Sequence, residues 1–231
     1  MYTYLLINFF TVLIPLALSF EPRVRYWKKW RYLFPALGTV GAVFIVWDAY
    51  FVQRGVWGFT PSYLLGVRFF KLPLEELLFF VCIPFSCVFI YEVIRYFDKK
   101  SFWARPFRPL CGAGAAAAFV LAVFNPGKIY TLVTFLCLSG VLFYRWRHPR
   151  NYMGRFFFMY LISLIPFFAV NGLLTGGIAV IDSRPVVWYS GAENLGIRIG
   201  TIPLEDFFYS MLLLLCNVSV YEYLRKKYQP V

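Results

Sequence analysis

The sequence predicts an all-α integral membrane protein. Of its 231 residues, 61% are hydrophobic and only 15% are charged, whereas soluble domains carry about 25% charged residues. Apolar runs of the roughly 18 residues that a membrane helix needs recur along the chain. Because these runs lack the alternating pattern of membrane strands, helices are the structure that satisfies their backbone hydrogen bonds in lipid.

Seven membrane spans are expected, and Pro and Gly residues separate several of them. Their ranges are 2–19, 32–50, 73–95, 109–125, 129–145, 156–175 and 203–224. The first run lacks a basic n-region and a small-residue cleavage site, so we interpret it as a span and not as a removable signal peptide. Small residues in the fourth span, around Gly112 and Gly114, indicate close helix packing and not a dinucleotide fingerprint.

The net charge of +12 is explained by membrane topology and does not indicate nucleic-acid binding. The loops after the first, third and fifth spans, together with the C-terminal end, hold 17 of the 23 Lys and Arg residues. A Lys and Arg excess marks the cytoplasmic side of a membrane. We therefore expect a multi-pass protein of the cell (inner) membrane, with an extracytoplasmic N-terminus and a cytoplasmic C-terminus.

An internal repeat relates the two halves of the chain. Residues 65–95 align with residues 195–225 without a gap, so that LGVR matches LGIR and PLEE matches PLED. Spans one to three therefore repeat as spans five to seven, and span four connects them. This predicts a parallel repeat with a pseudo-two-fold axis along the membrane normal. The expected units are a first repeat at 1–105, a connector at 106–127 and a second repeat at 128–231.

Two pairs of acids open the third and seventh spans, and we predict that they are catalytic. They are Glu75, Glu76, Glu205 and Asp206. Acids in the first turn of a helix face the positive end of its dipole, so helix capping is the ordinary interpretation. However, a single acid would suffice for capping, and both halves of the chain have two. Acids inside membrane spans also carry a free-energy cost for insertion. Neighbouring carboxyls in an apolar site cannot all ionise, so one can give a proton and another can take one.

Other residues are predicted to bind a substrate near these acids. Asp48 lies in the last turn of the second span, on the acid side of the membrane, and Asn171 corresponds loosely to it in the sixth span. The predicted substrate-binding set also includes two arginines and three tryptophans close to the acids: Arg68, Arg198, Trp47, Trp57 and Trp188. Aromatic ring faces in such a place can stabilise a carbocation.

The remaining polar signals favour structural roles. Glu92 and Glu222 lie near the cytoplasmic ends of their spans, and each has an Arg three residues later, which is the spacing of a helix-surface ion pair. His148 is the only histidine, which excludes a bis-histidine haem or a histidine-rich metal site. The sequence therefore predicts no metal centre.

The motifs of the two halves resemble those of a known family, the membrane-integral, flavin-free lycopene cyclases. The resemblance rests on the GxR-x4-PLEE segment, on GIRIGTIPLEDF in the second half and on NGLLTG at 171–176. It covers nearly the whole chain. Members of this family occur in bacteria and archaea, as domains of fungal fusion enzymes, and as heterodimers of two small proteins, of which this chain resembles a fused form.

The resemblance implies a reaction without a cofactor or net redox change. An acid protonates the terminal double bond of lycopene, a neighbouring alkene attacks the cation, and proton loss leaves a beta-ionone ring, giving gamma-carotene and then beta-carotene. The implied partners are a membrane-embedded C40 carotenoid and the bilayer, with homo-oligomers or other carotenoid enzymes as further possibilities. Related cyclases form epsilon or gamma rings or C50 products. A proton-coupled transporter and a non-catalytic scaffold are the alternatives from other classes.

Overall fold

The computed structural model describes residues 2–176 and 183–228, and these residues are mostly helical. The α-helices within them are α1 (Thr3–Leu18), α2 (Trp30–Arg54), α3 (Leu74–Phe97), α4 (Arg108–Val123), α5 (Ile129–Arg147), α6 (Met153–Gly176) and α7 (Leu204–Tyr228). The 3-10 turns η1 (Tyr26–Lys29) and η2 (Pro61–Tyr63) lie in the connections. Each helix falls within a few residues of an expected span.

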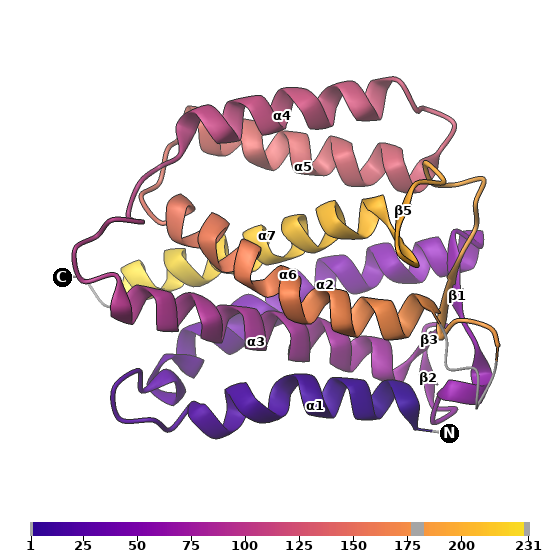
Figure 1. Ribbon diagram of the computed structural model, residues 1–231, viewed down its shortest axis with the longest axis horizontal. Coiled ribbons are helices and arrows are strands. Elements are labelled where there is room, and N and C mark those ends of the chain that lie inside the picture. Colours follow the sequence, from indigo (N-terminus) through magenta and orange to yellow (C-terminus); the bar gives the residue numbers. More distant parts are fainter. Residues whose placement is uncertain (1, 177–182, 229–231) are drawn as a thin grey trace.

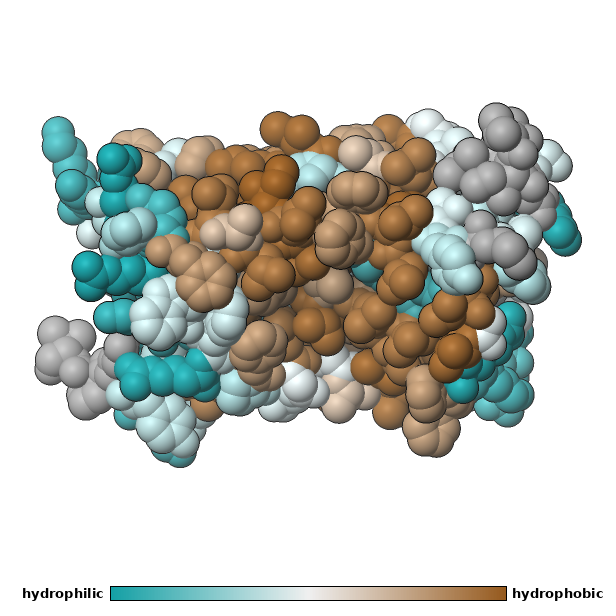
Figure 2. Space-filling view, turned by 90° about the horizontal axis from the view of Figure 1, so that it is seen from below, coloured by the Kyte–Doolittle hydropathy of each residue, from teal (hydrophilic) through white to brown (hydrophobic). Residues whose placement is uncertain are grey.

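The helices lie side by side in one bundle (Figure 1). The α4–α5 hairpin lies on one side of the bundle and α1 on the opposite side, with α2, α3, α6 and α7 between them. Figure 2 shows a hydrophobic band between two hydrophilic ends, as expected of a protein surrounded by hydrocarbon. The prediction of a helical membrane protein is therefore confirmed.

Five helices among the described residues are long and apolar enough to cross a membrane: α2 with η1, α3, α5, α6 and α7. The helices α1 and α4 are apolar but have 16 residues each, which corresponds to about 24 Å at 1.5 Å per residue. In α4, a side chain at Gly112 would come within 3.1 Å of the Trp146 ring of α5. The small residues of α4 thus allow the two helices to approach closely, as predicted.

Short antiparallel strands shape one end of the bundle. Strands β2 (Arg68–Phe69) and β3 (Leu72–Pro73) form a hairpin directly before α3, and β5 (Arg198–Ile199) and β6 (Ile202–Pro203) form one before α7. Gly200 takes a positive φ in the second turn, a conformation that glycine adopts without strain. Each hairpin delivers its chain into the helix that carries an acid pair.

A third strand pair joins the two halves of the chain. Strand β1 (Trp57–Phe59) pairs with β4 (Val187–Tyr189), with Gly58 opposite Trp188. A side chain at Gly58 would come within 2.4 Å of the Trp188 ring. The indole therefore occupies the space that only a glycine leaves open, and the β1–β4 ribbon covers the end of the bundle where the acid pairs lie (Figure 1).

The opposite end is held by reciprocal hydrogen bonds between α3 and α7. The Tyr91 hydroxyl donates to Glu222 at 2.7 Å, and the Tyr221 hydroxyl donates to Glu92 at 2.9 Å. The predicted ion pairs are confirmed, because Arg95 lies 3.2 Å from Glu92 and Arg225 lies 2.8 Å from Glu222. Lys29 adds a further contact to Glu92. Each buried acid therefore has both a tyrosine and a cation as partners.

Removing either tyrosine hydroxyl should destabilise the bundle. Hydrogen bonds to charged groups contribute about 1.5–3 kcal/mol, so Tyr91→Phe and Tyr221→Phe should each lower the free energy of unfolding by about that amount. Denaturant unfolding in bicelles measures the loss. Tyr223→Phe is the matched control, because Tyr223 lies on α7 with 64% of its surface exposed. Equal stability of all three variants would show that the hydrogen bonds of Tyr91 and Tyr221 do not stabilise the bundle.

Candidate active site

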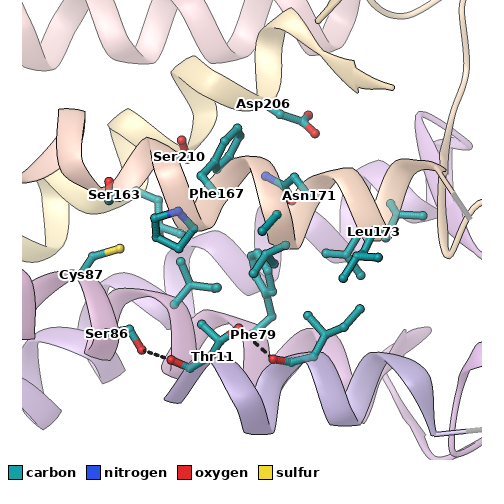
Figure 3. Close-up of a pocket in the computed structure, with 18 of the residues that line it drawn as sticks. Thr11, Phe79, Ser86, Cys87, Ser163, Phe167, Asn171, Leu173, Asp206 and Ser210 are labelled. Carbon is teal, nitrogen blue, oxygen red and sulfur yellow. Dashed lines mark hydrogen bonds between the residues drawn. The ribbon is translucent and has the colours of Figure 1, made fainter. Parts of the chain in front are cut away.

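An elongated cavity brings together five of the eleven predicted site residues, namely Asp48, Trp57, Glu76, Asn171 and Asp206. Its volume is about 660 Å3, and side chains from α1, α2, α3, α6 and α7, Tyr130 of α5 and the β1–β4 ribbon form its wall. Most of this wall is apolar. Three carboxylic acids, Asp48, Glu76 and Asp206, lie on it. Figure 3 shows Asp206 and Asn171 toward one end of the cavity, and Ser86, Cys87 and Ser163 toward the other.

The second acid of each repeated pair faces this cavity and accepts hydrogen bonds from tyrosines. Tyr4, at the start of α1, donates to Glu76 Oε2 at 2.5 Å. Tyr130, at the start of α5, donates to Asp206 Oδ1 at 2.6 Å, and Tyr189 of β4 donates to Oδ2 at 2.9 Å. Burial and the neighbouring Asp206 raise the pKa of Tyr189 well above its usual value, so its hydroxyl stays protonated and donates.

The first acid of each pair binds backbone instead. Glu75 accepts a hydrogen bond from the Leu65 amide at 2.5 Å, and Glu205 accepts one from the Leu195 amide at 2.7 Å. Thr131 also donates to Glu205, at 2.6 Å. Adjacent residues of an α-helix point about 100° apart, since 3.6 residues complete a turn. The structure therefore directs the first acid of each pair to the preceding loop and the second to the cavity.

Asp48 joins the two cavity acids from α2. Trp57 Nε1 donates to Asp48 Oδ1 at 2.6 Å. Asp48 interacts electrostatically with Glu76, and Glu76 interacts with Asp206. The cavity thus contains a carboxyl cluster, defined as Asp48, Glu76 and Asp206. Even so, the described residues contain no group of three His, Cys, Asp or Glu side chains arranged to hold a metal ion.

Aromatic rings surround the carboxyl cluster. The ring centroids of Trp57 and Tyr130 are 5.0 Å apart, and those of Tyr130 and Tyr189 are 6.0 Å apart. Tyr209 of α7 also lies on the cavity wall, and Trp47 packs behind it at 5.2 Å. Trp188 lies on the outer side of the ribbon with 42% of its surface exposed. Of the three predicted tryptophans, the structure therefore places Trp57 on the cavity wall.

The remaining predicted residues divide between the cavity and the surface. Asn171 lines the cavity (Figure 3). Arg68 and Arg198 are exposed in the two hairpins, where Arg198 donates to the Thr201 carbonyl at 2.6 Å. The guanidinium of Arg198 also lies 6.0 Å from the Tyr189 ring centroid. Both arginines therefore belong to the hairpins that precede the acid helices.

Sequence reasoning missed the tyrosines that bind the cavity acids. A signal for two of them exists: Tyr4, Leu6 and Phe9 of the first span align with Tyr130, Leu132 and Phe135 of the fifth. This alignment needs an offset four residues shorter than that of the acid motifs, because the loops of the two halves differ in length. No comparable repeat pattern marks Tyr189 or Tyr209.

Comparison with known proteins finds fungal proteins that share one name. The bifunctional lycopene cyclase/phytoene synthase of Gibberella fujikuroi is 25% identical over 123 residues, which cover 50% of this chain and 21% of that protein. The protein of the same name from Arthroderma gypseum is 29% identical over 79 residues, which cover 32% of this chain and 13% of that protein. The one from Neurospora crassa is 38% identical over 45 residues, which cover 20% of this chain and 8% of that protein. This chain thus matches about a fifth or less of each relative's length.

No solved structure matches the chain. The model of the lycopene cyclase family, in contrast, matches residues 1–94 and 127–224. These segments contain both acid pairs, all three members of the carboxyl cluster and the tyrosines that bind Glu76 and Asp206. Because the match covers well over half of the sequence, this chain belongs to the lycopene cyclase family.

Proposed function

We propose that this protein is a lycopene beta-cyclase that closes the linear end groups of lycopene into beta-ionone rings by acid catalysis. The observation that carries the proposal is the placement of Glu76 and Asp206, which come from the two halves of the chain and line one apolar cavity. The reaction class is an intramolecular lyase or isomerase, because the substrate and product have the same composition. Membership in the lycopene cyclase family supports the substrate class.

The hydrogen bonds suggest different roles for the two acids. Glu76 accepts its tyrosine bond on Oε2, which leaves Oε1 to carry a proton toward the cavity. Asp206 accepts a tyrosine bond on each oxygen and is suited to remain a carboxylate facing the developing cation. In this scheme Glu76 protonates the terminal double bond, the adjacent alkene attacks the tertiary cation, and the carboxyl cluster takes back the proton that the ring loses.

The surroundings of the cluster protect the cation. Water would capture a carbocation, so an apolar wall that excludes water favours ring closure. The rings of Trp57, Tyr130 and Tyr209 pack against one another on the cavity wall, and aromatic rings can stabilise positive charge through their quadrupoles. In this proposal Glu75 and Glu205 act as positioning residues, because their hydrogen bonds hold the loops before α3 and α7.

Amide substitutions should separate the two acids of each pair. Glutamine can still accept a backbone hydrogen bond but carries no transferable proton. Glu76→Gln and Asp206→Asn should therefore lower the rate of cyclisation by about 10²–10⁴-fold, whereas Glu75→Gln and Glu205→Gln should stay within about tenfold of the original rate. Pigment chromatography with mass detection in lycopene-accumulating cells, followed by assay of the purified protein in liposomes, measures the products.

Membrane insertion of each variant serves as the control for this experiment. Full activity of Glu76→Gln and Asp206→Asn would show that these acids only cap their helices. An unchanged lycopene pool with the original protein would instead favour a transporter or a scaffold. If the products contained epsilon or gamma rings, the acid-catalysed cyclisation would stand, but the proton would be lost from a different carbon.

We also propose that two parallel three-helix units, 1–105 and 128–231, are joined by the connector 106–127. Equivalent contacts support this arrangement. The hairpin pairs Arg68–Pro73 and Arg198–Pro203 have the same register, and the tyrosine–glutamate bonds of α3 and α7 are reciprocal. In this arrangement span four preserves the orientation of the second unit relative to the first.

The orientation in the cell membrane follows from the distribution of charge. Lys29, Arg95 and Arg225 gather at the end of the bundle opposite the carboxyl cluster, so that end should face the cytoplasm. A green fluorescent protein fused after Val231 should fluoresce, whereas alkaline phosphatase at the same position should be inactive. The opposite pair of results would reverse the proposed orientation and place the carboxyl cluster on the cytoplasmic side.

A further inference from the structure

The cavity is open on one side, between α1 and α6. Among the described residues that line it, the exposed ones all come from these two helices: Leu6, Phe10, Ile14, Pro166, Ala169 and Leu173. The three residues of α1 are spaced four apart, so they form one stripe along that helix. We refer to the gap bordered by these six residues as the α1–α6 slot.

The slot opens into the hydrophobic part of the surface. All six bordering side chains are apolar, and Phe10 and Ile14 are 63% and 65% exposed. The molecular face on the α1 side shows hydrophilic surface recessed between hydrophobic side chains within the apolar band (Figure 2). Only an apolar molecule dissolved in the bilayer would meet this opening without a large desolvation cost.

The other approaches to the cavity are covered. Trp57, Phe59, Val187 and Tyr189 of the β1–β4 ribbon form the wall next to the carboxyl cluster. At the opposite end of the bundle, the buried tyrosine–glutamate pairs tie α3 to α7. The slot is therefore the route that the described residues leave for an apolar substrate.

The cavity is long, but its acids lie at one end. On α3 its lining extends from Glu76 to Ile90, which is about 21 Å at 1.5 Å per residue. Glu76 and Asp206 occupy the first turns of their helices and Asp48 the last turns of α2, all at the end covered by the ribbon. The two end groups of an extended C40 polyene lie at its opposite extremities, so both cannot reach this cluster together.

We propose that a linear C40 polyene enters sideways from the bilayer through the α1–α6 slot, and that one carboxyl cluster cyclises its two end groups in separate binding events. This inference rests on the proposed function and adds the route by which the substrate enters and the order in which its two rings close. The polyene leaves after the first ring closes, turns in the lipid and presents its other end. Each closure takes one proton from the cluster and returns one, so the site is ready for the second end without any added reactant.

An isotope chase with the original protein tests the release of the intermediate. Liposomes containing the protein receive 13C-labelled lycopene, and excess unlabelled lycopene follows when the labelled monocyclic product first appears. The labelled monocyclic product should then persist, because unlabelled molecules compete for the cluster. Labelled bicyclic product forming at the unchallenged rate would overturn the inference. Absence of any cyclised product would instead overturn the proposed function.

A bulky side chain at the slot tests the route of entry. Ala169→Trp should lower the initial rate of lycopene consumption by about tenfold or more, since it fills the opening and misplaces the substrate. Ile165→Trp is the matched control, because Ile165 lies on α6 with 75% exposure and outside the cavity lining, and its rate should stay within about twofold. A folded Ala169→Trp variant with the original rate would overturn the lateral route. The chase result holds independently if that variant fails to fold.

Discussion

The arrangement of the site depends on a hydrogen bond made twice, from a loop amide to the first acid of each helix. Glu75 holds the Leu65 amide and Glu205 holds the Leu195 amide, each ten residues upstream. These bonds fix the hairpins against the starts of α3 and α7, where the helices have unsatisfied N–H groups and favour negative charge. With the first acid held in this way, the next residue of the helix must turn toward the cavity.

The two ends of the bundle have different tasks because their acids have different partners. At one end, Glu92 and Glu222 are paired with cations and tyrosines, so their charges are neutralised and the helices are tied together. At the other end, Glu76 and Asp206 have tyrosine hydroxyls as partners. A carboxyl whose hydrogen-bond partners are uncharged can exist as either the acid or the carboxylate in an apolar wall. Proton transfer requires both states.

Similar motifs in the two halves of the chain make similar contacts in the cavity, but the contacts are not identical. Tyr4 binds Glu76 as Tyr130 binds Asp206, yet Tyr189 of the ribbon contacts Asp206 and Trp57 contacts Asp48. The cluster therefore contains three carboxyls with different hydrogen-bond partners. The two sides of the bundle also differ, since the α1–α6 slot lies on the α1 side and the α4–α5 hairpin covers the opposite side (Figure 1).

The sequence by itself determined the helical membrane fold, the helix positions and the repeated acid motifs, because hydrophobic length, Pro and Gly punctuation and local charge are properties of short segments. It also indicated the ion pairs of Glu92 and Glu222, whose partners lie on the same helical turn. Only the tertiary structure decided which acid of each pair faces the cavity and placed Tyr189 and Tyr209 on the wall beside the carboxyl cluster. The reason is physical: these contacts join helices and strands far apart in the chain, and their geometry depends on how the whole bundle packs.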